Sequence, residues 1–271
     1  MTQARLTVMS FNLRYLNEQD GENHWSNRLD KVVKMIHNHR PDLIGTQEVL
    51  PSMLDDLTAA LPEYAWIGRG RDNEDGDGEH CAIFYKKDLA EVLEQGQFWL
   101  SETPETAGVA GWDARLPRIC TWAQFKGKDG TDLSGRTFLF YNTHLDHVGK
   151  LAKEESAKLI WKQMKEQWQH TSIPVMLTGD FNSHPDTMPI QYLDERSFDE
   201  DNALRLVNAY EVIDGPVGAT AHGFKGIMEA SSIKGKPIDY IYVSSDLQVI
   251  ETEVDRSRIG GGYPSDHYPV V

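Results

Sequence analysis

The feature that most constrains the fold of this chain is a series of short apolar runs rich in β-branched and aromatic residues. Runs of this length and composition predict β-strands. They are Leu6–Phe11, Leu43–Val49, Cys81–Tyr85, Gln97–Leu100, Ile119–Phe125, Thr137–Thr143, Val175–Thr178 and Ile238–Val243. Several runs follow one another without an intervening helix, which favours α/β layers that differ from a simple doubly wound sheet.

Helical spacing appears between some of these runs. Arg28–His39 and Leu151–Trp168 each carry apolar residues on one helical face, and Pro41 ends the first of these predicted helices. The apolar faces are most typical of core contacts and comprise Leu29, Val32, Val33 and Ile36 in the first helix, and Ala157, Ile160, Trp161, Met164 and Trp168 in the second. A length of 271 residues without an internal repeat predicts one α/β domain over residues 1–271.

Polar residues stand at the ends of the strand-like runs. The most informative segment is Leu177–Pro185, LTGDFNSHP, where Asp180 and Asn182 directly follow an apolar run. Because Gly179 allows a sharp turn, the side chains beyond it are expected to project away from the core. Taken alone, the segment is equally typical of an Asx turn.

Comparable segments recur along the chain. They are Ser10–Asn12, Thr46–Glu48, Asn142–His147, Ile238–Tyr240 and Ser265–Tyr268. Any single one is explained by an ordinary role, such as a cap, a surface acid or a buried histidine. Burying acids, amides and histidines together near a core costs free energy unless their charges are compensated and their polar atoms form hydrogen bonds. Together, the segments therefore indicate a functional cluster at the strand ends.

The acidic balance of the chain limits its partners. It has 42 Asp and Glu residues against 27 Lys and Arg residues, a formal net charge of −15. Proteins bind duplex nucleic acid largely by neutralising phosphates with Lys and Arg, so a duplex partner is disfavoured. An acidic bias also suits a site for divalent cations, although a solvated acidic surface explains it equally well.

Other sequence features are best explained by structure. Cys81 and Cys120 are too few for a disulfide framework and are not spaced like zinc ligands. No run approaches the ~20 apolar residues of a membrane span and no signal-peptide pattern opens the chain, so we expect a cytoplasmic protein without a transmembrane segment. Asp72–Glu79 has calcium-loop spacing, but Phe84 stands where the last acidic ligand is required, so we expect a solvated hairpin loop.

The chain resembles the endonuclease/exonuclease/phosphatase superfamily and is similar to its compact bacterial members. These metal-dependent phosphoesterases include pancreatic-type deoxyribonucleases, apurinic endonucleases, neutral sphingomyelinases, inositol polyphosphate 5-phosphatases and deadenylases. The matching segments, in the superfamily's order from residue 10 to the final residues, are SFNLRY, DLIGTQEV, NTHLDH, LTGDFNSHP, IDYIYVS and YPSDHYPVV. The resemblance implies a DNase I-like, four-layer α/β sandwich in which two mixed β-sheets are flanked by helices.

The resemblance also implies a cation site and an activated water. Glu48 would be the principal ligand of Mg²⁺ or Mn²⁺, with Asn12 and Asp266 nearby, directly or through water. Oxygen-only ligation favours these ions over zinc. Asp180 would orient and deprotonate the attacking water, and Asn182 would hold Asp180 in place.

Further implied roles concern the phosphoryl group. Asp239 would fix the tautomer of His267 so that its other ring nitrogen faces a phosphoryl oxygen. His144 and Asn142 would supply further contacts to the phosphate. Arg14 departs from the apurinic-endonuclease branch, which has an acidic residue there; a cation weakens a two-metal mechanism and suits contact with a substrate phosphate.

Substrate recognition is less constrained by the sequence. Arg115, Arg118 and Trp25 combine cationic and aromatic side chains in a way that suits a phosphate beside a sugar or base, and His222 is a weaker candidate. An equally plain interpretation places the tryptophans in the core and the arginines in solvent. We expect a small phosphorylated molecule or a short nucleotide as substrate; whether it is a monoester or a diester, and the oligomeric state, stay open.

Two alternative functions remain. The segment from Asn142 to His147 differs from the H-x-H-x-D-H motif of metallo-β-lactamase-like zinc hydrolases by Asn142 in place of the first His, which leaves Glu48 unexplained. The other alternative is a non-catalytic protein that binds a phosphorylated ligand on the same fold. Such a protein is expected to have lost the ligand, base or imidazole, whereas Glu48, Asp180 and His267 are all present.

Overall fold

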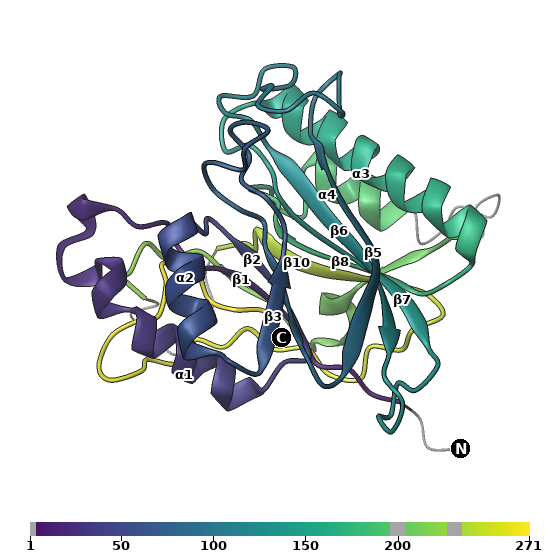
Figure 1. Ribbon diagram of the computed structural model, residues 1–271. Coiled ribbons are helices and arrows are strands. Elements are labelled where there is room, and N and C mark those ends of the chain that lie inside the picture. Colours follow the sequence, from purple (N-terminus) through teal and green to yellow (C-terminus); the bar gives the residue numbers. More distant parts are fainter. Residues whose placement is uncertain (1–3, 196–203, 227–234) are drawn as a thin grey trace.

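Two mixed β-sheets pack face to face, with helices on their outer faces, in the computed structural model (Figure 1). The structure describes residues 4–195, 204–226 and 235–271. In Figure 1, α1 and α2 cover one sheet and α3 and α4 cover the other. The predicted four-layer α/β sandwich is therefore confirmed.

The first sheet has the strand order β1-β2-β4-β3. Strands β1 and β2 are parallel because the chain crosses over through α1, whereas β4 runs antiparallel to both of its neighbours. The elements of this half are β1 (Val8–Asn12), α1 (Leu29–His39), β2 (Leu43–Gln47), α2 (Pro51–Ala60), β3 (Tyr64–Ile67) and β4 (Ile83–Lys86), with the short 3₁₀-helices η1 (Glu18–Asn23) and η2 (Trp25–Asn27) after β1.

The second sheet has the strand order β5-β6-β7-β8-β10-β9, and only its β7–β8 pair is parallel among the described strands. Its elements are β5 (Ala90–Trp99), β6 (Ile119–Gly127), β7 (Thr137–His144), α3 (Lys150–Thr171), β8 (Val175–Asp180), α4 (Met188–Glu195), β9 (Leu206–Asn208), η3 (Ala209–Val212) and β10 (Asp239–Ser244). Across the described parts of the chain, no helix has both the length and the apolar character needed to cross a membrane.

The alternation of side chains along β1 decides what faces the second sheet. Met9 and Phe11 belong to the apolar core that also contains buried side chains of α1 and α2. Since successive side chains in a strand point to opposite faces, Ser10 and Asn12 face the other sheet. Asn12 is fully buried, at the end of the strand nearest the candidate site.

The two sheets approach each other closely at Gly45 of β2. A Cβ atom there would lie only 2.0 Å from the Thr178 Oγ1 atom and 2.6 Å from the Asn142 Oδ1 atom. Gln47 donates a 2.7 Å hydrogen bond from Nε2 to Asn142 Oδ1, and Asn142 donates a 2.8 Å bond to the Thr46 carbonyl. Glycine and the hydrogen-bonded amides thus let the ends of the sheets meet without steric clash.

The predicted strands all match observed strands, and both predicted helices are present. Strands β3 and β9 and the shorter helices α2 and α4 were not predicted from the sequence. Only the apolar end of β5 was predicted, because residues 91–96 of this edge strand include Glu91, Glu94 and Gln95 and none of them is buried. The loop after β3 closes as predicted, since Arg71 N donates to the Glu79 carbonyl at 3.1 Å.

Candidate active site

Three neighbouring strands of the second sheet each contribute one polar side chain, an imidazole and two carboxyl groups, that lie in a row. Asp180 at the end of β8 is in register with His144 on β7 and with Asp239 on β10. Residues directly opposite in a sheet share one face, so these three side chains project together toward the first sheet. All three are buried. The hydrogen-bonding pattern of the sheet therefore builds this part of the site.

His267 completes the row from the C-terminal segment. Its Nδ1 atom lies 2.9 Å from Asp239 Oδ2 and 3.1 Å from Oδ1, and its Nε2 atom lies 3.9 Å from Asp180 Oδ2. Burial favours the neutral ring, but the Asp239 carboxylate and its hydrogen bond outweigh burial and hold the pKa of His267 well above its ordinary value. The ring is therefore positioned as a cation whose Nε2 proton faces Asp180.

Asp180 is the most perturbed acid of the row. Burial, together with the neighbouring Asp239 carboxylate, raises its pKa to about 7 against the opposing effect of His267. The carboxylate accepts hydrogen bonds from the Asn182 backbone at 2.8 Å and from Asn12 Nδ2 at 3.0 Å. A carboxyl group with a pKa near neutrality is suited to accept a proton from water at physiological pH.

Glu48 reaches the same point from the first sheet. Asn12 Nδ2 donates to Glu48 Oε1 at 3.0 Å as well as to Asp180, and Tyr15 N donates to Glu48 Oε2 at 3.1 Å. The carboxyl groups of Glu48 and Asp180 thus share one amide, although they belong to different sheets. The central requirement of the sequence-based hypothesis, that these two acids meet, is satisfied.

Several residues of this region have left-handed backbone conformations. The φ angles are 55° at Arg14, 63° at Glu48 and 45° at Asn182. Non-glycine residues rarely adopt such angles, and they persist where surrounding contacts hold the backbone. Each of these residues lies one or two positions after the end of a strand, where the chain turns beside the cluster.

Asn182 connects the acid to the histidine on β7. Its Nδ2 atom donates to His144 Nε2 at 3.0 Å and to the Leu145 carbonyl at 3.0 Å. Burial and the nearby Arg118 hold the pKa of His144 well below its ordinary value, so this ring is neutral. The site thus pairs one cationic imidazole, His267, with one neutral imidazole.

The donor set fits a hard divalent cation. Glu48, His144 and Asp180 each offer a ligand atom, and these atoms lie within 4.8 Å of one another. Carboxylate oxygens are the ligands that Mg²⁺ and Mn²⁺ prefer. Asn12 turns its amide nitrogen toward both acids, because its Oδ1 atom accepts a 2.9 Å hydrogen bond from Arg14 N. In this orientation Asn12 links the acids and offers no oxygen to a cation.

The loops around Asp266 are tied together by Arg28, which lies close to Trp25 in the sequence. Arg28 is buried, and its Nη1 atom donates to the carbonyls of Leu13 and Pro264 at 2.7 Å each. It therefore holds the turn after β1 against the segment that carries Asp266 and His267. Burial raises the pKa of Asp266, whose Oδ2 atom lies 3.9 Å from Arg14 Nε. The guanidinium of Arg14 is bound mainly to Asp20, at 3.0 and 3.1 Å.

The remaining residues proposed for substrate contact lie in different surroundings. Asn142 and Trp25 are buried, and Trp25 donates to Asp56 Oδ2 at 2.8 Å. Because the polar atoms of both side chains already have protein partners, neither side chain is free to bind a substrate phosphate. Arg115 is exposed. His222 stacks on Tyr268, with ring centroids 4.0 Å apart, and burial lowers its pKa to about 4.

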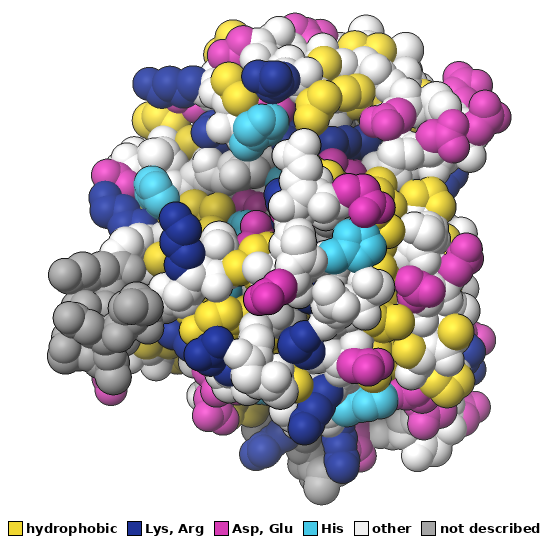
Figure 2. Space-filling view, turned by 90° about the vertical axis from the view of Figure 1, so that its left-hand side faces the viewer, with side chains coloured by type: hydrophobic (Ala, Val, Ile, Leu, Met, Phe, Trp, Pro, Cys, Tyr) yellow, Lys and Arg dark blue, Asp and Glu magenta, His cyan; other side chains and the backbone are white. Residues whose placement is uncertain are grey.

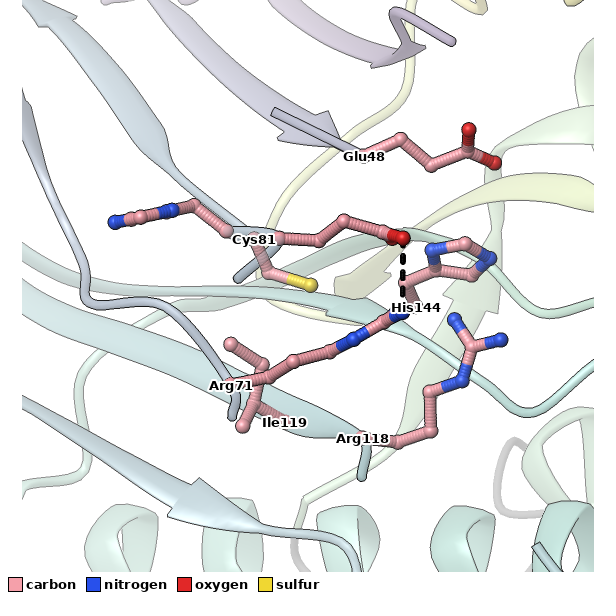
Figure 3. A pocket seen from close by; sticks show the side chains of 8 residues that line it. Glu48, Arg71, Cys81, Arg118, Ile119 and His144 are labelled. Carbon is pink, nitrogen blue, oxygen red and sulfur yellow. Dashed lines mark hydrogen bonds and ion pairs between the residues drawn. The ribbon is translucent and has the colours of Figure 1, made fainter. Parts of the chain in front are cut away.

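Arg118 lies in a recess beside Glu48 and His144 (Figure 3). The same recess contains Arg71 and Glu79, which the sequence analysis missed. Their pairing could have been predicted from their positions on either side of the Asp72–Gly78 loop, because a hairpin brings its flanking residues together. Arg71 Nη2 donates to Glu79 Oε1 at 2.8 Å, the contact drawn as a dashed line in Figure 3.

The zinc-hydrolase alternative gains no support from this arrangement. Asn142 lies between the sheets, and Asp146 Oδ1 accepts hydrogen bonds from the backbone of Val148 and Gly149 at 2.9 and 2.7 Å. His147 Nδ1 lies 2.9 Å from an Arg118 nitrogen. Within the described residues, neither cluster of potential metal ligands includes Asp146 or His147.

Comparisons with known proteins agree with this architecture. A structure of a mannosyl-6-phosphatase from Bacteroides thetaiotaomicron VPI-5482 is 38% identical, covers 98% of each chain and superposes with a TM-score of 0.87. A structure from Bacteroides vulgatus, described as an endonuclease/exonuclease/phosphatase, is 35% identical over 98% of this chain and 96% of its own, with a TM-score of 0.79.

Curated relatives are more distant and longer. Protein angel of Drosophila melanogaster is 25% identical over 205 residues, which make up 73% of this chain and 55% of the relative. Carbon catabolite repressor protein 4 homolog 3 of Arabidopsis thaliana is 27% identical over 198 residues, 67% of this chain and 40% of the relative. The chain thus spans about half the length of these curated relatives.

The family model described as "Endonuclease/Exonuclease/phosphatase family" matches residues 9–267. This match runs from β1, which carries Asn12, to His267, and so includes the strand ends at which the cluster is built. The chain belongs to the endonuclease/exonuclease/phosphatase family.

Proposed function

We propose that this protein is a divalent-cation-dependent hydrolase of phosphoesters of small molecules. The observation that carries the proposal is the bridge made by Asn12, whose amide nitrogen lies 3.0 Å from both Glu48 and Asp180. This bridge puts a candidate cation ligand next to a carboxyl group whose pKa is about 7. The His267–Asp239 pair adds a positive charge on the other side of Asp180.

Asp180 acts as the general base in this proposal. Its raised pKa lets it take a proton from the attacking water, and the backbone amide of Asn182 holds it in place at 2.8 Å. His267, kept protonated by Asp239, stabilises the negative charge that develops on the phosphoryl oxygens. His144, oriented by Asn182, provides a second imidazole contact to the same group.

Glu48 is the proposed principal ligand of Mg²⁺ or Mn²⁺, with Asp266 nearby. When bound, such a cation withdraws charge from the phosphoryl group and helps to orient it for in-line attack. The hydrogen bond from Tyr15 N to Glu48, at 3.1 Å, fixes the direction of this carboxylate. Asn12 keeps Glu48 and Asp180 at a constant separation through its two hydrogen bonds.

A small phosphorylated molecule, such as a sugar phosphate, is the proposed substrate, with a short nucleotide as the alternative. The 38% identical solved structure is that of a mannosyl-6-phosphatase, which supports a sugar phosphate. The net charge of −15 opposes binding of a long polyanion. On the face drawn in Figure 2, several Lys and Arg side chains gather in the lower part, and Asp and Glu side chains are spread over the rest of the face.

A panel of phosphomonoesters and phosphodiesters, assayed with Mg²⁺, with Mn²⁺ and with EDTA, tests the proposal. We expect turnover of at least one sugar phosphate or nucleotide that EDTA abolishes and that added cation restores. Binding of phosphorylated ligands without turnover across the panel would favour the non-catalytic alternative. Tight stoichiometric zinc in the purified protein, together with zinc-dependent turnover, would favour the zinc-hydrolase alternative.

A further inference from the structure

A pair of buried arginines lies beside the proposed catalytic groups. Arg71 comes from the loop after β3 and Arg118 directly precedes β6; the exposed fractions of these residues are only 6% and 4%. Figure 3 shows both side chains extending toward His144. The recess between them is lined by Glu48, Arg71, Glu79, His80, Cys81, Arg118, Ile119 and His144.

Both guanidinium groups have donors that the protein does not use. Within the described residues, the buried Arg71 Nε and Arg118 Nη1 atoms make no hydrogen bond. Arg71 is held by Glu79 through Nη2 at 2.8 Å, and its Nε atom is 3.8 Å from Asp72. Arg118 is held by Asp146 through Nε at 3.4 Å and contacts His147. A buried charged donor without a hydrogen bond is costly, so each points to a missing acceptor.

Two carboxylates also line the recess, but Glu79 is bound to Arg71 and Glu48 to Asn12 and Tyr15, so the unused guanidinium donors favour an anion as that acceptor. Burial lowers the pKa of Arg118, and the positive charge of Arg71 lowers it further. The two arginines therefore repel each other across a recess from which most water is excluded. Asp146 compensates the charge of Arg118 through one long contact, 3.4 Å from Arg118 Nε to Oδ2, while its Oδ1 atom accepts two backbone hydrogen bonds. An anion between the guanidinium groups would satisfy the free donors and reduce this repulsion.

We infer that Arg71 and Arg118 bind the terminal oxygens of a phosphomonoester and so make it the preferred substrate class. This inference rests on the proposed function. A monoester carries up to two negative charges and three non-bridging oxygens, which gives both arginines an acceptor. A diester has one charge and one fewer free oxygen, because a second organic group occupies that position. The recess would therefore discriminate by charge and by hydrogen bonding.

Substrate selectivity distinguishes this role from a structural one. We would measure kcat/KM for p-nitrophenyl phosphate and for bis(p-nitrophenyl) phosphate in the wild type, Arg71→Gln and Arg118→Gln. Each substitution should lower kcat/KM for the monoester by about 10- to 100-fold and for the diester by less than about threefold. The lysine variants should recover part of the loss. As a control, Arg69→Gln removes an exposed charge nearby and should leave the ratio of kcat/KM for the monoester to that for the diester unchanged.

Binding to the wild-type protein provides a test that does not need the variants to fold. Calorimetric titration with methyl phosphate and with dimethyl phosphate should show at least tenfold tighter binding of methyl phosphate. Equal affinity for the two probes, or arginine variants with an unchanged monoester-to-diester ratio, would overturn the inference while leaving the proposed function intact. Tighter binding of methyl phosphate without turnover of any ester would support the role of Arg71 and Arg118 in monoester binding and contradict the proposed function.

Discussion

The two sheets contribute to the candidate site in different ways. The second sheet supplies His144, Asp180 and Asp239 from directly opposite positions on neighbouring strands, and His267 packs against them. We call these four residues the proton side. The first sheet supplies Asn12 from a strand and Glu48 from the turn after one, and we call these two residues the cation side.

The difference lies in how each side is held. All four residues of the proton side are buried, and three of them, His144, Asp180 and Asp239, are fixed by the sheet's hydrogen-bonding register. Glu48 is only half-buried, has a φ angle of 63°, and depends on hydrogen bonds from Asn12 and Tyr15. In the proposed mechanism, rigid strands would therefore set the geometry and pKa of proton transfer, while a turn would leave room for a cation and substrate to enter.

Among the substitutions considered, Asp180→Asn should lower the catalytic rate most, because it removes the proposed base of the proton side. Removing the base while keeping the side-chain shape should lower kcat by about 10²- to 10⁴-fold. Steady-state assays at saturating Mg²⁺ provide the measurement. The matched control is Asp186→Asn, which changes an exposed aspartate in the following loop. Near-full activity of Asp180→Asn would remove this residue as the general base.

His267→Ala should cause the next largest decrease in kcat. The variant removes a cationic donor and leaves Asp239 without its partner, so we expect kcat to fall by about 10²- to 10³-fold. The exposed His184→Ala substitution serves as the control. An unchanged kcat in His267→Ala, with a changed KM for the cation, would contradict the role assigned to His267.

Glu48→Gln should affect the cation side selectively. The substitution removes a ligand charge, so the Mg²⁺ concentration for half-maximal activity should rise by about 10- to 100-fold. At saturating Mg²⁺ the rate should recover further than it does in Asp180→Asn. Metal titrations of activity compare the two variants, with Glu63→Gln, a partly exposed acid on the outer side of the first sheet, as control. An unchanged titration curve for Glu48→Gln would exclude Glu48 as a ligand.

The smallest expected effect concerns stability without metal. The folded-state pKa of Asp180, about 7, exceeds the ordinary value of 3.8, so folding favours its protonated form. Its contribution to stability is greatest below the ordinary pKa and is lost as pH rises through about 7. In EDTA at pH 8, Asp180→Asn should therefore raise the Tm by about 2 to 8 °C relative to wild type.

The same difference in Tm should be much smaller at pH 5, where folded Asp180 is already protonated. Adding Mg²⁺ at pH 8 should also narrow it, because the cation stabilises the wild-type acids. Thermal melts at both pH values, with and without Mg²⁺, complete the measurement. A Tm gain that is equal at pH 5 and pH 8 would argue against a raised pKa of Asp180 in the folded protein.

Much of the site could be predicted because its signals are local. A run of apolar residues that ends in Gly179-Asp180-Phe181-Asn182 specifies a strand and the turn after it, and side-chain alternation puts Asp180 on one face. The same logic applies to Glu48, after β2, and to Asp239, at the start of β10. Short apolar runs therefore located the strands, although the polar part of β5 was missed.

Long-range packing decided the remainder. Asn142 has the same local pattern as His144, yet its register position puts it against Gly45 and Gln47 between the sheets. Arg71 lies far from Arg118 in sequence, and only the packing of the β3–β4 loop beside β6 brings both to one recess.

Local patterns in the chain were enough to predict most strand ends, the chemical groups placed there and the family resemblance they carry. Only packing over long range sets which polar atoms have protein partners and which, such as Arg118 Nη1, make no hydrogen bond within the described residues. The physical reason is that side-chain alternation is a property of consecutive residues. Burial, charge compensation and hydrogen-bond satisfaction depend on residues that are distant in the chain.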